Sequence, residues 1–176
     1  MDKKLYTLIV HSENIAGILN QITAVFTRQQ VNIESLNVSA SSIKGIHKYT
    51  ITAWSDEVQI QKINSQIEKK IDVIQSQVLT DDEIFIQEVA LIKVSTPVML
   101  ENPAVCKAIR TFNAQILESN SVFSVVTVTG MTDQIMNLYQ TLDNLDCVLQ
   151  YSRTGRIVIT KSLEEALSDK LAKFEN

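Results

Sequence analysis

The chain of 176 residues is 45% hydrophobic and carries a formal net charge of −4. This composition excludes disorder of the whole chain, because it provides enough apolar side chains for a packed core. The acidic balance argues against a protein that binds nucleic acid or an anionic membrane through a basic patch. We expect no secretory signal and no membrane span, because Met1–Lys4 leads into a short apolar run and no run reaches about 18 apolar residues.

The first half of the chain predicts the element order βαββαβ. Its strand-like runs are rich in β-branched residues, and its helical segments repeat apolar residues every three or four positions. Two of the strands flank a short polar segment with a glycine and therefore predict a hairpin. The predicted elements are a strand at Leu5–Val10, a loop and helix cap at His11–Asn14, a helix marked by Ile18, Ile22, Val25 and Phe26, strands at Val31–Val38 and Lys48–Trp54, a helix marked by Ile60, Ile63 and Ile67, and a strand at Ile71–Leu79.

The second half repeats this order more weakly. Its first strand is expected to end at a proline, because proline has no N–H to donate to a sheet. The predicted elements are a strand at Val89–Val94 that stops at Ser95–Pro97, a helix marked by Val105, Ile109 and Phe112, strands at Gln115–Glu118 and Val122–Thr129, a helix marked by Ile135, Leu138 and Leu142, and a closing strand formed by Cys147–Tyr151 with Arg156–Thr160.

The two copies predict an α+β fold in which two ferredoxin-like βαββαβ sandwiches follow one another. We place the first domain at 4–79 and the second, C-terminal domain at 84–161, with the acidic segment Thr80–Glu83 as a solvated boundary between them. Apolar residues at helical spacing predict a tail helix at 162–176. A sandwich of this kind leaves a sheet face or an edge strand open, so we expect the chain to form a homodimer.

The sequence contains no arrangement of residues suited to catalysis or to metal binding. His11 and His47 have no clustered cysteines or carboxylates at ligand spacing, and the four glycines are too scattered for a phosphate-binding loop. No serine has a visible base to activate it. Cys106 and Cys147 lack a CxxC partner and are expected to be reduced, which indicates a cytoplasmic protein. We therefore predict neither an enzyme nor a metalloprotein.

Two other classes of protein share the βαββαβ order, and the sequence disfavours both. RNA-recognition modules stack bases on aromatic residues of their central strands. The only candidates in the third strand, Tyr49 and Trp54, lack basic surroundings. An acylphosphatase-like hydrolase would need an arginine in a phosphate-binding first loop, and residues 11–17 contain none.

The most informative residues lie where the first strand turns into the first helix. Such a turn exposes backbone N–H groups at the positive end of a helix dipole, which suits a carboxylate. Gly17 has no Cβ to keep a ligand from this backbone, and Asn14 offers donor and acceptor atoms for an ammonium or a carboxylate. The residues alone favour equally an amino-acid site and an ordinary asparagine cap with a glycine turn. Further candidates are Asn32, which opens the second strand, and the apolar neighbours Ile15, Ile18, Leu19 and Ile33.

These motifs resemble the ACT domain of acetolactate synthase regulatory subunits. The pattern Asn-x-x-Gly-x-Leu follows the first strand, and the more specific pattern Asn-Ile-Glu-Ser-Leu opens the second. The second half of the chain is also similar to this family, so that the resemblance covers about residues 4–161. The segments that carry it are Asn14–Leu19, Asn32–Leu36, Glu88–Val94, Phe112–Ile116 and Ser152–Gly155.

The resemblance implies a non-catalytic subunit that activates a separate catalytic subunit and confers feedback inhibition by a branched-chain amino acid, commonly valine. It implies an ACT domain that dimerises and binds this effector where two copies meet. It also implies that thiamine diphosphate, FAD and Mg²⁺ belong to the catalytic subunit, so that this chain holds no cofactor. The effector-binding residues carried over from the family are Asn14, Gly17, Ile18, Leu19, Asn32 and Ile33, with Asn32 expected from the facing subunit.

The sequence differs from the family pattern at two pairs of residues. Ile15-Ala16 stands where a polar pair is common, and Asn20-Gln21 stands where a pair of the Ser-Arg type is usual. The asparagine and the glycine of the first motif are kept. The alternative function is that of a stand-alone tandem-ACT sensor of another amino acid, and the element Asn32–Leu36 favours the synthase subunit over it.

Overall fold

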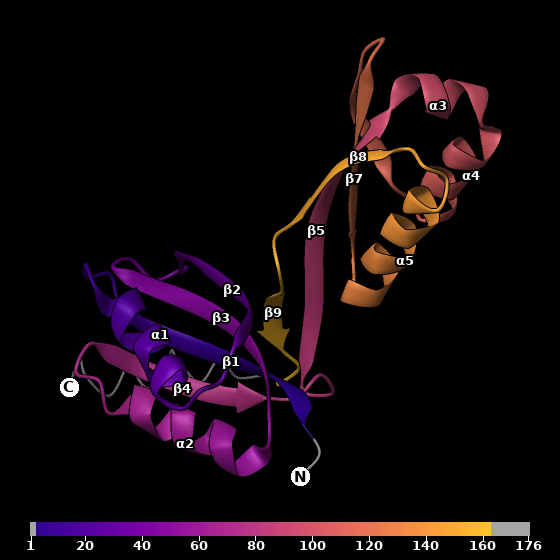
Figure 1. The fold of residues 1–176 in the computed structure, drawn as a ribbon. Coiled ribbons are helices and arrows are strands. Elements are labelled where there is room, and N and C mark those ends of the chain that lie inside the picture. Colours follow the sequence, from indigo (N-terminus) through magenta and orange to yellow (C-terminus); the bar gives the residue numbers. More distant parts are fainter. Residues whose placement is uncertain (1–2, 163–176) are drawn as a thin grey trace. The chain divides into compact units, whose positions relative to one another are not determined.

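The computed structural model describes residues 3–162, which fold as two units (Figure 1). The first unit contains the described residues up to Phe85 and those from Arg156 onward. The second unit contains Ile86–Gly155. Within the described range, no helix is both long enough and apolar enough to cross a membrane.

The first unit is a four-stranded antiparallel sheet with the strand order β2-β3-β1-β4. Strand β1 is central and pairs on both sides, so that Leu8 lies opposite Ile51 of β3 and Val78 of β4. The helices α1 and α2 cover one face of this sheet (Figure 1). The elements are β1 (Lys4–Glu13), α1 (Ile18–Arg28), β2 (Ile33–Ala40), β3 (Ile46–Ser55), α2 (Glu57–Glu68) and β4 (Val73–Leu79).

The core of the first unit lies between this sheet face and the two helices. The predicted apolar stripe of α1 is confirmed, because Ile18, Ile22, Val25 and Phe26 are all buried. Burial of an aliphatic or aromatic side chain contributes about 1.5–3 kcal/mol, so this stripe fixes the helix on the sheet. The other core residues of the unit are Tyr6, Leu8, Val10, Val31, Tyr49, Ile51, Ala53, Ile60, Ile63, Ile67 and Val73.

Strand β9 (Ile157–Thr160) belongs to the first unit. The Lys48 ammonium on β3 donates a hydrogen bond to the Val158 carbonyl at 2.8 Å. Val158 itself is buried. Strand β9 also pairs with β5. The chain therefore returns to the first unit after it has completed the second.

The second unit repeats the βαββαβ order, with the strands arranged β6-β7-β5-β8. Its core contains apolar residues from both α4 and α5 and from the central strands. The predicted α+β fold with two such sandwiches in tandem is confirmed. The elements are β5 (Ile84–Ser95), α3 (Thr96–Glu101), α4 (Pro103–Thr111), β6 (Gln115–Ser119), β7 (Phe123–Gly130), α5 (Thr132–Asp143) and β8 (Val148–Arg153).

Several element bounds differ from the predicted ones. Strand β1 continues to Glu13 rather than ending at Val10, because its backbone pairs with β3 up to the partners Glu13 and Ile46. Strand β5 stops at Ser95 as expected, but the proline segment then starts a short helix, in which the Val98 N–H donates to the Ser95 side chain. The predicted closing strand is divided into β8 and β9. The predicted tail helix lies, beyond residue 162, outside the described residues.

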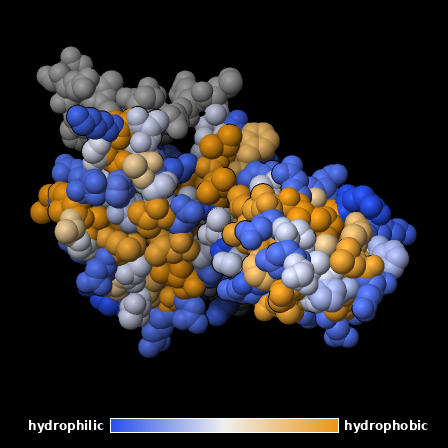
Figure 2. Space-filling model, turned by 90° about the horizontal axis from the view of Figure 1, so that it is seen from above, coloured by the Kyte–Doolittle hydropathy of each residue, from blue (hydrophilic) through white to orange (hydrophobic). Residues whose placement is uncertain are grey.

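Hydrophobic side chains also reach the surface of the protein (Figure 2). On the face shown they form several patches with hydrophilic side chains between them. Apolar atoms normally make up more than half of a protein's surface, so exposed hydrophobic residues do not by themselves define a binding site. The site is better sought where polar groups and a hollow coincide.

Candidate functional site

The loop between β1 and α1 places the first group of predicted residues at one end of the first sheet. The Asn14 N–H donates to the carbonyl of Gly45 in the β2–β3 hairpin at 2.9 Å. The predicted asparagine cap is wrong, because the N-cap residue of α1 is Gly17 and no side chain caps this helix end. The side chain of Asn14 is thus exposed and is not used to start the helix.

Gly17 has the backbone conformation for which a glycine is needed. Its φ is +91°, which lies in the left-handed region that side chains disfavour. A Cβ built on Gly17 would meet nothing within 4 Å, so the space beside this residue is open. The glycine therefore allows the sharp turn into α1 and leaves the backbone accessible from outside.

The start of α1 is suited to an anion. The first backbone N–H groups of a helix have no carbonyl partner within the helix and lie at the positive end of its dipole. No acidic side chain lies in the first turn of α1 to neutralise this end. The Ile18 N–H makes only a long hydrogen bond of 3.4 Å to the Ile15 carbonyl. A ligand carboxylate could therefore accept hydrogen bonds from the first backbone N–H groups of α1, which no acidic side chain of the first turn neutralises.

The apolar residues of this group divide between the core and the surface. Ile18 is 3% exposed and belongs to the core, so only its backbone is available to a ligand. Ile15 and Leu19 are exposed by 44% and 41% and can contact a ligand side chain.

Asn32 and Ile33 lie at the opposite end of the same sheet. Ile33 pairs with Ala53, whereas Glu13, next to Asn14, pairs with Ile46 at the other end of β3. Ala53 and Ile46 are seven positions apart (53 minus 46), and a strand rises about 3.3 Å per residue, which gives roughly 23 Å. One chain therefore does not bring Asn32 to Asn14.

A hollow of about 490 Å³ lies on the hairpin side of Asn14. Its lining includes one acidic residue, Glu13, and one basic residue, Lys44, beside aliphatic residues. Lys44 and Ile74 were not predicted as site residues, because strand pairing over long sequence distances brings them to the loop. The residues that line the hollow are Glu13, Asn14, Ile15, Lys44, Gly45, Ile46 and Ile74.

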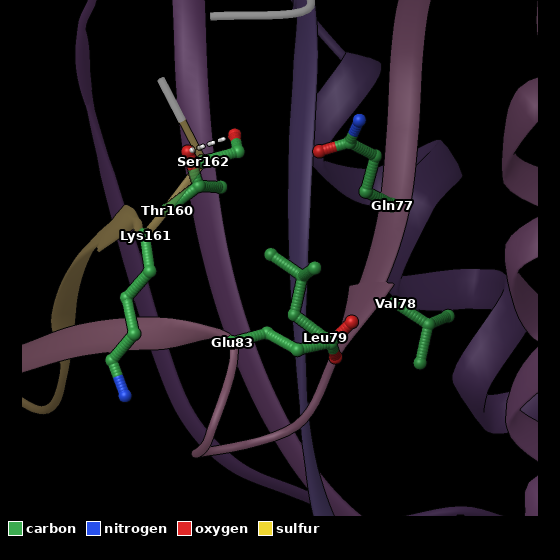
Figure 3. Close-up of a pocket in the computed structure, with 7 residues that line it drawn as sticks. All are labelled: Gln77, Val78, Leu79, Glu83, Thr160, Lys161 and Ser162. Atoms are coloured by element: carbon green, nitrogen blue, oxygen red, sulfur yellow. Dashed lines mark hydrogen bonds between the residues drawn. The ribbon is translucent and has the colours of Figure 1, made fainter. Parts of the chain in front are cut away.

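A second hollow of about 500 Å³ lies between β4, the acidic turn after it and the end of β9 (Figure 3). Gln77 and Val78 extend from opposite faces of β4 (Figure 3). Glu83 accepts hydrogen bonds from Thr80, and Lys161 donates to the Asp82 carbonyl. These internal bonds make this hollow the weaker candidate.

The acidic segment Thr80–Glu83 is held by two basic residues near β9. Arg156 forms an ion pair with Asp81, with a nitrogen–oxygen distance of 2.6 Å. The hydrogen bond from the Thr80 hydroxyl lowers the pKa of Asp82, and the charge of Lys161 adds to this effect. The segment is therefore a structured turn with its own charged partners in the first unit.

The turn Ser152–Gly155, which carried part of the family resemblance, has a structural role. Arg153 is paired with the carboxylate of Glu88 at 2.9 Å, and the Glu88 side chain is only 1% exposed. The Thr132 hydroxyl at the start of α5 donates to the same carboxylate. The Thr154 hydroxyl accepts a hydrogen bond from the Val89 N–H at 3.1 Å. These bonds join β5, β8 and α5.

Histidines and cysteines form no cluster in the part of the chain that the structure describes. No group of three or more histidine, cysteine or carboxylate residues there could hold a metal ion. Cys106 and Cys147 are not joined in a disulfide. Burial raises the pKa of the Cys147 thiol, which favours its neutral form.

The fold and the loop together define a protein of the tandem-ACT class, with an ACT domain followed by a second βαββαβ domain. A family model described as "AHAS small subunit-like ACT domain" matches residues 8–75, and one described as "Small subunit of acetolactate synthase" matches residues 87–162. The chain belongs to the family of acetolactate synthase small subunits, which are regulatory.

Known relatives are similar over nearly the whole chain. The acetolactate synthase small subunit of Bacillus subtilis is 30% identical over 168 residues, which cover 94% of this chain and 95% of that one. That of Buchnera aphidicola is 28% identical and covers 85% of this chain and 94% of its own. The crystal structure of the small subunit from Thermotoga maritima has the same fold, with a TM-score of 0.82 and 20% identity over 92% of this chain and 99% of that one.

Proposed function

We propose that this chain associates with the catalytic subunit of acetolactate synthase, raises its activity and makes it subject to inhibition by valine or another branched-chain amino acid. The family membership supports the association with a larger catalytic subunit. The single observation that supports the effector site is the start of α1, where Gly17 opens the backbone and neither a side-chain cap nor an acidic residue occupies the helix end.

The effector is an amino acid with an aliphatic side chain. Its carboxylate suits the backbone N–H groups of Ile18 and Leu19 at the positive end of the helix dipole. The side-chain amide of Asn14 adds donor and acceptor atoms. The exposed side chains of Ile15 and Leu19 provide apolar contact for the aliphatic part.

We further propose that two copies of the chain form the complete effector site. Asn32 and Ile33 lie roughly 23 Å along the sheet from the β1–α1 loop of their own chain. Strand β2 is an edge strand of the first sheet, and unpaired edges of this kind are a common place for a second copy to pair. A dimer formed through this region would let Asn32 of one copy serve the loop of the other.

The catalytic chemistry belongs to the other subunit. We assign thiamine diphosphate, FAD and Mg²⁺ to the catalytic subunit and expect this chain to bind none of them. The biosynthetic role and the two free cysteines are consistent with a cytoplasmic location.

Inhibition requires that the effector bind two states of the assembly with different affinity. A coupling free energy of about 1–3 kcal/mol would change the activity equilibrium roughly 5–150-fold. An effector held between two copies of the ACT domain favours the arrangement of the copies in which both halves of its site are present. This preference is the source of the coupling free energy.

The test combines the purified chain with the catalytic subunit of the same organism. Co-elution of the two on size exclusion, together with a higher rate of acetolactate formation from pyruvate, is the expected result. A chain that neither co-elutes nor changes this rate would contradict the proposal and would point to a stand-alone sensor of amino acids.

A further inference from the structure

The hollow beside Asn14 contains charged groups that the effector site still lacks. The residues carried over from the family supply backbone N–H groups, which suit a carboxylate, and neutral amide side chains, which carry no charge to hold an ammonium. The ammonium group of an amino acid has three donors and no acceptor, and the positive end of a helix dipole repels it. A carboxylate near the loop would therefore hold the ammonium more strongly than a neutral amide does.

Glu13 and Lys44 provide opposite charges at this place. Both residues line the hollow of about 490 Å³ together with Asn14. Both are exposed, and among the described residues neither forms an ion pair with the other or with a third group. Each charge is therefore available to a ligand, and no internal ion pair has to be broken first.

The backbone fixes these two residues relative to Asn14. Glu13 is the last residue of β1 and pairs with Ile46, and its N–H donates to the Asp72 carbonyl at 2.9 Å. Lys44 precedes Gly45, whose carbonyl accepts the Asn14 N–H at 2.9 Å. Gly45 has a φ of +83°, which turns the hairpin at this point.

Aliphatic side chains complete the lining of the hollow. Ile46 is 7% exposed, and Ile15 is 44% exposed. Ile74 on β4 is half-buried. An unbranched or charged ligand side chain would gain less from these contacts than a branched aliphatic one.

We propose that Glu13 and Lys44 recognise the ammonium and the carboxylate of the effector, and so determine that the site takes a zwitterionic amino acid. Glu13 accepts hydrogen bonds from the ammonium, and Lys44 donates to the carboxylate oxygen that the α1 amides leave free. This inference rests on the proposed effector function and adds the two residues that read its charges.

The test measures binding of three probes to the full chain by isothermal titration calorimetry. The probes are valine, valinamide, which lacks the carboxylate, and 3-methylbutanoate, which lacks the ammonium. Glu13→Gln should weaken the binding of valine about tenfold and leave the binding of 3-methylbutanoate unchanged. The loss of one charge-assisted hydrogen bond has an effect of this size. Lys44→Gln should weaken the binding of valine about tenfold and leave the binding of valinamide unchanged.

The controls are exposed residues of the same types outside the hollow. Glu118→Gln on β6 and Lys62→Gln on α2 should leave the affinity for all three probes unchanged. Circular dichroism of each variant confirms that it is folded. If Glu13→Gln and Lys44→Gln bind valine like the original chain, this inference is overturned and the effector function remains. If the original chain binds none of valine, leucine and isoleucine, both this inference and the proposed effector function are contradicted.

Discussion

Arg153 and Glu88 form an ion pair in which the carboxylate is withdrawn from water. The Glu88 side chain is 1% exposed and the Arg153 side chain 26%, and their nitrogen–oxygen distance is 2.9 Å. Arg156 and Asp81 form a pair of the same type at 2.6 Å, but the Asp81 side chain is 49% exposed. The two pairs therefore differ in which partner is buried: it is Glu88 in the first pair and Arg156, whose side chain is 9% exposed, in the second.

We predict that Arg153→Met destabilises the second unit by about 2–4 kcal/mol. Removing one partner of a buried pair leaves the other charge without its counter-ion, which usually costs about 3–5 kcal/mol, although the Thr132 hydroxyl still donates to Glu88. Partial exposure of Arg153 lowers this cost. The free energy of unfolding in urea, followed by circular dichroism, measures the effect.

Arg156→Met is the matched control for this prediction. Asp81 stays solvated when its arginine is lost, so the cost should be only about 1 kcal/mol. The double variant Glu88→Leu with Arg153→Met should recover most of the stability, because no buried charge remains. Equal losses for the two single arginine variants would show that burial of Glu88 does not determine the cost.

The conformation of Gly17 predicts a cost for any side chain at this position. Gly17→Ala should lower the free energy of unfolding by about 1–2 kcal/mol, because the left-handed φ of +91° strains an L-residue. The open space around the glycine means that strain, and not a clash, is the cause. Urea unfolding measures this loss, and an unchanged midpoint would mean that the loop adopts another conformation.

A site shared between two copies predicts complementation in mixed dimers. Asn14→Ala and Asn32→Ala homodimers should each lose valine binding. A purified dimer with one copy of each variant has one intact site and one site with both changes, so it should bind about half as much valine as the original dimer. Calorimetry gives this stoichiometry. No binding in the mixed dimer would contradict a site that takes Asn14 from one copy and Asn32 from the other.

Burial of Cys147 predicts a loss of stability at high pH. Its pKa is raised in the folded chain, so the unfolded chain ionises first. The contribution of this thiol is full below its ordinary pKa of 9.0 and falls as the pH rises above that value. The difference in unfolding free energy between about pH 7 and pH 10 should therefore shrink in Cys147→Ala.

The two thiols should also differ in reactivity. Cys147 is fully buried, whereas Cys106 is partly exposed. Iodoacetamide should modify Cys106 first in the native chain and both cysteines in urea, as peptide mass spectrometry can show. Equal rates in the native chain would contradict the burial of Cys147.

The sequence predicts those parts of the fold in which one local pattern determines the structure. The stripe from Ile18 to Phe26 predicts α1, because apolar residues at helical spacing must share one buried face. The sequence did not predict that β1 extends to Glu13. Pairing with β3 keeps this residue in the strand although its side chain is polar. The return of β9 to the first unit was missed as well, because it depends on contacts such as the pair of Asp81 and Arg156, 75 positions apart.

The candidate site was predicted only in part for the same reason. Asn14 and Gly17 could be found because they lie in one loop between a strand and a helix. Lys44 and Ile74 reach the same loop only through strand pairing, which no local pattern specifies. The distance of Asn32 from Asn14 follows from the register of β2 on β3, and this register became visible only in the structure.

The most direct test of the regulatory function is a valine titration of acetolactate formation from pyruvate. The catalytic subunit is assayed alone, with the original chain and with Asn14→Ala. We predict that both chains raise the rate and that valine inhibits only the assembly with the original chain. Stimulation by both chains with equal inhibition by valine would contradict the assignment of the effector to the β1–α1 loop, and absence of any stimulation would contradict the regulatory function itself.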